Sequence, residues 1–69
     1  MNTKKKLGII IQKRRIELGF SQEKLAQATK LHRTYISMLE RGLRSPTITT
    51  ILKISKALDK KLSALLKEL

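Results

Sequence analysis

The chain has 69 residues, which leave room for one small domain, and it has no cysteine, which excludes disulfides. Its single histidine and five scattered carboxylates offer no cluster with metal-ligand spacing, so we expect no metal site and no cofactor. Sixteen Lys and Arg give a formal net charge of +11 at pH 7, which predicts a polyanionic partner without indicating which one.

The hydrophobic pattern predicts an all-α domain of five short helices, since the alternation typical of strands is missing. The first helix is expected over about residues 5–18, with Leu7, Ile11 and Leu18 on one stripe. Gly19 is expected to end it, because glycine adopts the left-handed conformation of a helix terminus at little cost. Residues 1–6 are expected to form a basic tail.

Two shorter helices follow. Ser21 is expected to cap the first of them, over residues 22–29, with Glu23 in its first turn. The expected inner face consists of Leu25, Ala26, Ala28 and Thr29. The next helix is expected over residues 33–41 and is ended by Gly42. Its expected inner residues are Ile36 and Leu39.

The last two helices are more apolar. Thr47 is expected to cap a fourth helix that ends at about Leu58. Its expected inner stripe consists of Ile48, Ile51, Leu52, Ser55 and Leu58. The fifth, residues 61–69, is predicted to be a dimerisation helix, because its leucines exceed what one neighbouring helix readily covers. The expected homodimer interface is Leu62, Leu65 and Leu69, with Leu66 on the same apolar face. In the alternative interpretation these leucines only complete the core of the monomer.

The helices over residues 22–29 and 33–41 are joined by about three residues, a spacing typical of the helix-turn-helix. In that motif the first helix crosses the DNA backbone and the second enters the major groove. In a strongly basic domain this pair indicates double-stranded DNA as the anionic partner.

The residues of the motif resemble a known family. Residues 19–26 read GFSQEKLA, residues 35–42 read YISMLERG, and Pro46 precedes the Leu- and Ile-rich fourth helix. Together they resemble the Cro and phage-repressor family, also called the XRE type, over about residues 7–66. The run LHRTYIS at 31–37, with Glu40, Arg41 and Arg44, is similar to the small controller proteins of restriction-modification systems. The resemblance implies a compact lambda-repressor-like domain that controls a restriction-modification operon, including its own promoter.

Two opposite charges fall on apolar stripes. Arg15 lies four residues after Ile11, and Glu40 lies four residues after Ile36. Because charges on inner faces need partners, we expect Arg15 and Glu40 to form a structural ion pair, and family members similar to this chain place such a pair at the matching positions. A catalytic role for Glu40 is the alternative.

The face of the third helix opposite its apolar residues is expected to read DNA. The expected base-reading residues are Arg33, Thr34, Ser37 and Met38. Arg33 is the strongest candidate, because a guanidinium can bridge the O6 and N7 acceptors of guanine. A phosphate contact alone is its alternative. Met38 is included through the resemblance, with solvent-exposed packing as its alternative.

The residues expected to contact phosphates are Gln22, Tyr35, Arg41, Arg44 and Thr47. Gln22 matches the family glutamine whose side chain and backbone amide meet the DNA backbone, at a helix N-terminus that suits an anion. For the basic residues a merely solvated side chain is the alternative, and for Tyr35 it is a partly buried structural role. Lys4, Lys5 and Lys6 are either a disordered tail or an additional DNA arm.

Two positions depart from the family pattern. Lys30 stands near the turn where Gly or Asn is usual, so we expect it to adopt a strained left-handed conformation. His32 stands at the cap position of the third helix, where Ser, Thr or Asp is usual. It is expected to cap poorly and either to remain a surface histidine or to approach a phosphate when protonated.

The sequence therefore predicts a homodimeric, sequence-specific transcriptional regulator without catalytic residues, on a roughly palindromic operator, with RNA polymerase as a further partner if it activates. Phage-type repressors and antitoxin-like regulators are alternatives, as is a basic protein that binds RNA or ribosomes. The longest apolar run is far too short to span a membrane, and no export signal follows the basic N-terminus, so we expect a cytoplasmic, nucleoid-associated protein.

Overall fold

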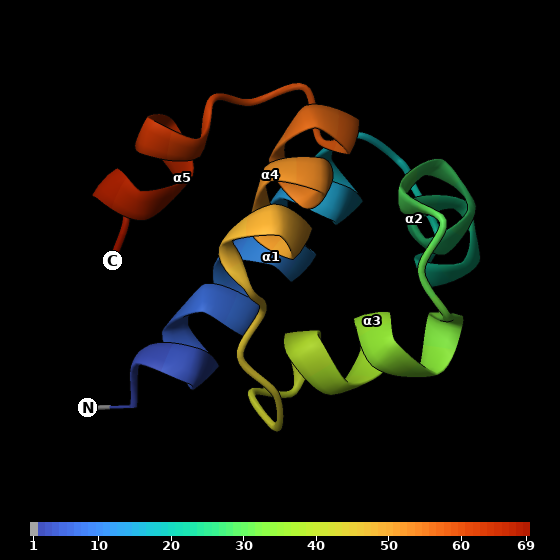
Figure 1. Cartoon of the computed structure of the whole chain (residues 1–69). Coiled ribbons are helices and arrows are strands. Elements are labelled where there is room, and N and C mark those ends of the chain that lie inside the picture. The colour runs from blue at the N-terminus through green and yellow to red at the C-terminus, as the bar shows by residue number, and fades with distance from the viewer. Residues whose placement is uncertain (1) are drawn as a thin grey trace.

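The computed structural model describes residues 2–69, which contain five α-helices and no strand (Figure 1). The helices are α1 (Thr3–Glu17), α2 (Gln22–Thr29), α3 (Arg33–Glu40), α4 (Ile48–Ala57) and α5 (Leu62–Lys67). α3 lies along the lower side in Figure 1, α4 lies above it, α1 runs from the lower left to behind α4, and α5 is on the side away from α2. This architecture confirms the all-α, five-helix prediction.

The helix termini follow local sequence signals. Ser21 Oγ accepts a hydrogen bond from the backbone N–H of Lys24, and Thr47 Oγ1 accepts one from that of Thr50. His32 precedes α3 without a side-chain cap hydrogen bond. Lys30 has a φ of 58°, so a non-glycine residue occupies the left-handed conformation between α2 and α3. These observations agree with the expected caps and with the strain expected in the turn.

α1 begins earlier than predicted. Asn2 caps it by accepting from the backbone N–H of Lys4, and the helix is continuous from Thr3. Lys4 to Lys6 are therefore helical, which corrects the prediction of a basic tail over these residues; Met1, its first residue, lies outside the described residues. Lys6 Nζ donates to the backbone carbonyl of Leu69 at 2.8 Å, so the start of α1 contacts the segment after α5.

The core lies where α1, α2, α3 and α4 meet. Its completely buried large side chains, together with one from α5, are Ile11, Leu25, Ile36, Leu39, Ile54, Leu58 and Leu65. Ala28 is exposed, contrary to its prediction as an inner residue of α2. In α4, Ile54 is buried, whereas Ile48 and Leu52 are 72% and 49% exposed, so these two predicted core residues lie on the surface.

Leu65 is fully buried in the protomer, which corrects its assignment to a dimer surface. Leu62 packs partly buried against the core, and Leu66 and Leu69 are 43% and 38% exposed. Leu65 therefore completes the core of the monomer, whereas Leu66 and Leu69 remain at the surface.

Gly8 sets the distance between α1 and α3. A Cβ atom on Gly8 would lie 2.3 Å from the carbonyl oxygen of Leu39 and 2.7 Å from that of Glu40. Both are backbone atoms, so no side-chain rotation relieves the overlap. The absence of a side chain at Gly8 therefore lets α1 approach the end of α3, where Arg15 of α1 meets Glu40.

Candidate nucleic-acid interface

The outer face of α3 presents the side chains predicted to read bases. Its inner residues Ile36 and Leu39 are buried, whereas Arg33 and Thr34 are exposed. Arg33, Thr34 and Ser37 together line a hollow of about 150 Å³. Because successive turns of a helix place such residues side by side, three of the four predicted base-reading residues form one surface. The fourth, Met38, is half-buried and does not line this hollow.

Tyr35 and Arg44 approach each other from α3 and from the loop after it. The guanidinium carbon of Arg44 lies 5.7 Å from the centroid of the Tyr35 ring, within cation–π range. Tyr35 is half-buried and packs against the core, while Arg44 is exposed. The ring therefore limits the positions that Arg44 adopts beside α3. Arg41, which follows α3, is also exposed.

Thr47 has a structural role in addition to the predicted phosphate contact. Its Oγ1 accepts from the backbone N–H of Thr50 at 3.2 Å and lies 3.0 Å from Thr50 Oγ1. The hydroxyl therefore caps α4, and the side chain is exposed at that helix N-terminus. The cap itself was predicted from the sequence, but the bond to the Thr50 hydroxyl was not.

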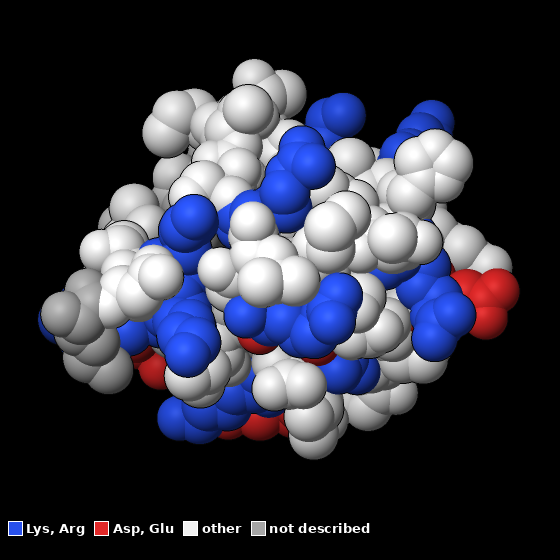
Figure 2. All heavy atoms as spheres, turned by 90° about the horizontal axis from the view of Figure 1, so that it is seen from below, with Lys and Arg blue, Asp and Glu red and all other residues white. Residues whose placement is uncertain are grey.

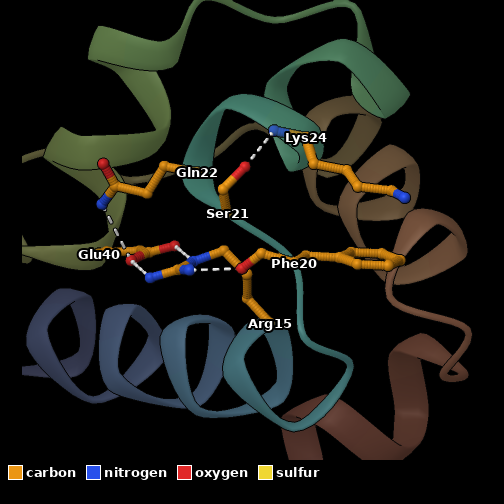
Figure 3. Close-up of polar contacts among 6 residues, drawn as sticks. All are labelled: Arg15, Phe20, Ser21, Gln22, Lys24 and Glu40. Carbon is orange, nitrogen blue, oxygen red and sulfur yellow. Dashed lines mark hydrogen bonds and ion pairs between the residues drawn. The ribbon is translucent and has the colours of Figure 1, made fainter.

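Arg15 and Glu40 form the ion pair expected from their inner-face positions (Figure 3). Arg15 Nε lies 2.7 Å from Glu40 Oε2, and its Nη2 donates to Glu40 Oε1 at 3.0 Å. The Arg15 and Glu40 side chains are only 11% and 1% exposed. Two parallel charge-assisted bonds in a buried site join α1 to the C-terminal end of α3.

The same pair also binds the start of α2. Arg15 Nη1 donates to the backbone carbonyl of Phe20 at 2.6 Å, and Gln22 Nε2 donates to Glu40 Oε1 at 3.1 Å. Sequence reasoning placed Gln22 at a phosphate but missed its bond to Glu40. No periodic pattern relates the two residues, which are 18 positions apart and meet only in the folded chain.

Figure 2 shows the molecule from the side on which α3 lies in Figure 1. Lys and Arg side chains extend across much of this face, and Asp and Glu occupy a small part of it. Glu40, one of the five carboxylates of the chain, is buried and paired. The face is therefore suited to a polyanion, and α3 lies on the same side of the molecule.

Within residues 2–69 no three His, Asp or Glu side chains gather into a group able to hold a metal ion. In the same part of the chain no helix has the length and apolar character needed to cross a bilayer.

Comparison with known proteins relates this geometry to a family. A model of the helix-turn-helix family matches residues 11–65. The control protein C.BamHI of Bacillus amyloliquefaciens is 60% identical over 40 residues, which are 58% of this chain and 49% of that protein. The chain thus spans about half the length of this curated relative.

Solved structures share the whole arrangement. The restriction-modification controller protein C.AhdI of Aeromonas hydrophila is 37% identical, with a TM-score of 0.87 over 90% of this chain and 94% of that chain. A further structure is the tetramer of the controller protein C.Esp1396I in complex with its natural 35 base-pair operator. Its protein chain is 39% identical to this one, with a TM-score of 0.83 over 94% of this chain and 91% of that chain. With α2 and α3 both inside the matched segment, the chain belongs to the helix-turn-helix family.

Proposed function

We propose that the protein is a sequence-specific, double-stranded DNA-binding transcriptional regulator of a restriction-modification operon. The observation that carries this proposal is the exposed face of α3, where Arg33, Thr34 and Ser37 share one surface, with α3 itself on a basic side of the molecule. The similarity of the chain to a controller protein whose structure was solved with its operator supports duplex DNA, and not RNA, as the partner. This role needs no catalytic residue. It implies a protein that works in the cytoplasm, at the nucleoid. If the regulator activates transcription, RNA polymerase is a further partner.

In this proposal α3 enters the major groove and the surrounding groups hold the phosphates. Arg33 reads a guanine, and Thr34, Ser37 and Met38 contact neighbouring bases. The backbone is contacted by Gln22 at the start of α2, and by Tyr35, Arg41, Arg44 and Thr47 around α3. Phosphate contacts of this kind give affinity without sequence information, whereas Arg33 supplies discrimination.

Arg33→Ala is expected to reduce the preference for the selected operator over unrelated duplex DNA by about tenfold to a hundredfold. A bidentate arginine–guanine contact contributes about 1–3 kcal/mol of discrimination. Fluorescence anisotropy at one fixed salt concentration measures both affinities. Arg41→Ala is the matched control, and we expect it to weaken both duplexes by a similar factor. Equal losses on both duplexes for Arg33→Ala would show that Arg33 contacts only phosphate, and tighter binding to RNA would refute the proposed function.

We further propose that the protein acts as a homodimer, with α5 and the neighbouring part of α4 at the interface. Leu65 lies in the core, whereas Leu62 is half-buried and Leu66 and Leu69 are 43% and 38% exposed. Leu52 of α4 is also exposed and lines a surface hollow together with residues of the α4–α5 connection, so we include it in the proposed interface. A symmetric dimer presents two α3 helices about 34 Å apart and requires a roughly palindromic operator.

Leu66→Asp is expected to shift the protein from dimer to monomer at micromolar concentration, because it places a charge in a contact that must be dehydrated. Sedimentation velocity measures the change. Ile16→Asp, at a residue of α1 that is 61% exposed, is the matched control and is expected to remain dimeric. If wild type sediments as a monomer at this concentration, or if both variants dimerise like wild type, the proposed interface is wrong.

A further inference from the structure

The amide of Gln22 has one orientation that its neighbour permits. Glu40 is buried and its ionised carboxylate oxygens only accept hydrogen bonds, so Gln22 must present its Nε2 group to Glu40 Oε1. The Nε2 group carries two N–H donors, and the contact with Glu40 uses one of them. Figure 3 shows the Gln22 nitrogen facing the Glu40 carboxylate, so this bond fixes the direction of the second N–H, and Gln22 is only partly buried.

The backbone at this position is also unpaired by the helix. The first N–H groups of a helix have no intrahelical acceptor, and Ser21 Oγ accepts only that of Lys24. Gln22, as the first residue of α2, therefore offers its backbone N–H beside its remaining amide N–H. Two adjacent donors at a positive helix terminus suit a phosphate oxygen.

Glu40 is itself held by Arg15, so its position does not depend on Gln22. The two bonds from Arg15 fix both carboxylate oxygens, and the Arg15 bond to the Phe20 carbonyl fixes the chain just before α2. A buried carboxylate at the end of α3 thereby determines where the donors at the start of α2 lie. Glu40 therefore links the donors at the start of α2 to the end of α3.

We propose that Glu40 is a positioning residue for DNA binding: through Gln22 it orients a phosphate donor relative to α3, in addition to stabilising the fold. The proposal rests on the proposed function and adds a determinant of affinity to it. A purely structural Glu40 would affect operator binding only through the folded fraction, and its effect would not depend on the residue at position 22.

The test is a double-mutant cycle in operator affinity. One side of the cycle replaces the ion pair by Arg15→Met with Glu40→Met, because exchange of both partners for apolar residues of similar volume is often neutral for stability. The other side is Gln22→Ala. We expect each change to weaken operator binding about tenfold, and the combination to be weakened by about the same tenfold and not a hundredfold. Gln27→Ala, at an exposed residue of the same helix, is the control and is expected to show no coupling.

Circular dichroism and thermal melts select conditions in which every variant is folded. If the variant with both Met substitutions does not fold, NMR relaxation of the side-chain amides in the wild-type protein provides the test, because it measures their mobility. The NH2 group of Gln22 is then expected to be nearly as rigid as the backbone, and that of exposed Gln27 to be mobile. Additive effects in the cycle, or equal mobility of the two amides, would overturn the positioning role. If wild type binds no duplex preferentially, the proposed function fails instead.

Discussion

Glu40→Ala is expected to lower the free energy of unfolding by about 3–5 kcal/mol. The substitution removes both carboxylate acceptors of the Arg15 guanidinium, which keeps only the Phe20 carbonyl. The Arg15 side chain is only 11% exposed, so its charge stays buried without a counterion. Gln22 loses its partner as well. A domain of this size has little stability in reserve, so much of the variant should be unfolded near physiological temperature.

Urea denaturation followed by circular dichroism measures the loss. The control is the double change of Arg15→Met with Glu40→Met, which removes the stranded charge and is expected to recover most of the stability. The short Arg15–Glu40 bonds indicate that the pair holds α1 against α3. A free energy of unfolding of Glu40→Ala within about 1 kcal/mol of the wild-type value would contradict this role.

Gly8→Ala is expected to destabilise the protein by about 3 kcal/mol, although the same change in an ordinary helix is stabilising by about 0.5–1 kcal/mol. The new methyl group would overlap the carbonyl oxygens of Leu39 and Glu40, at 2.3 Å and 2.7 Å. Relief requires α1 to move away from α3, which would stretch the Arg15–Glu40 bonds. The sign of the effect thus separates close helix packing from helix propensity.

Gly19→Ala provides the comparison. Gly19 has a φ of 73° and open space around the position of a Cβ atom, so only backbone strain of about 1 kcal/mol is expected. Thermal unfolding of the two variants ranks these effects. A Gly8→Ala variant as stable as wild type would mean that α1 and α3 do not approach as closely as described.

Local features of the fold were predictable because they depend on neighbouring residues. The caps at Ser21 and Thr47 and the left-handed Lys30 follow from side-chain chemistry within one turn, and the structure has all three. Glu40 could be paired with Arg15 from sequence because each charge stands on an otherwise apolar stripe.

Which apolar side faces inward was harder to predict. In α4 an apolar stripe at helical spacing can be drawn from Ile48 or from Ile51. The structure buries the stripe that contains Ile51 and Ile54, and Ile48 and Leu52 are exposed. The same ambiguity in α5 assigned Leu65 to the surface. Helix rotation is decided by the packing of other helices, which a single segment does not reveal.

Contacts between distant segments could not be predicted from the sequence, for a different reason. The approach of Gly8 to the Leu39 carbonyl and the bond from Gln22 to Glu40 arise only when three helices are placed together. In the interface, base-reading candidates followed from the face of one helix, whereas the groups that position them belong to α1, α2 and α3 jointly.

Selection of bound duplexes from a random pool, followed by sequencing, shows directly whether the protein recognises a DNA sequence. We expect enrichment of a roughly palindromic site whose half-sites lie about one helical turn apart, with a guanine for Arg33 in each half. The same selection with Arg33→Ala should lose the preference at that guanine. Recovery of duplexes without any enriched sequence would contradict sequence-specific regulation and leave only the non-specific affinity that a charge of +11 provides.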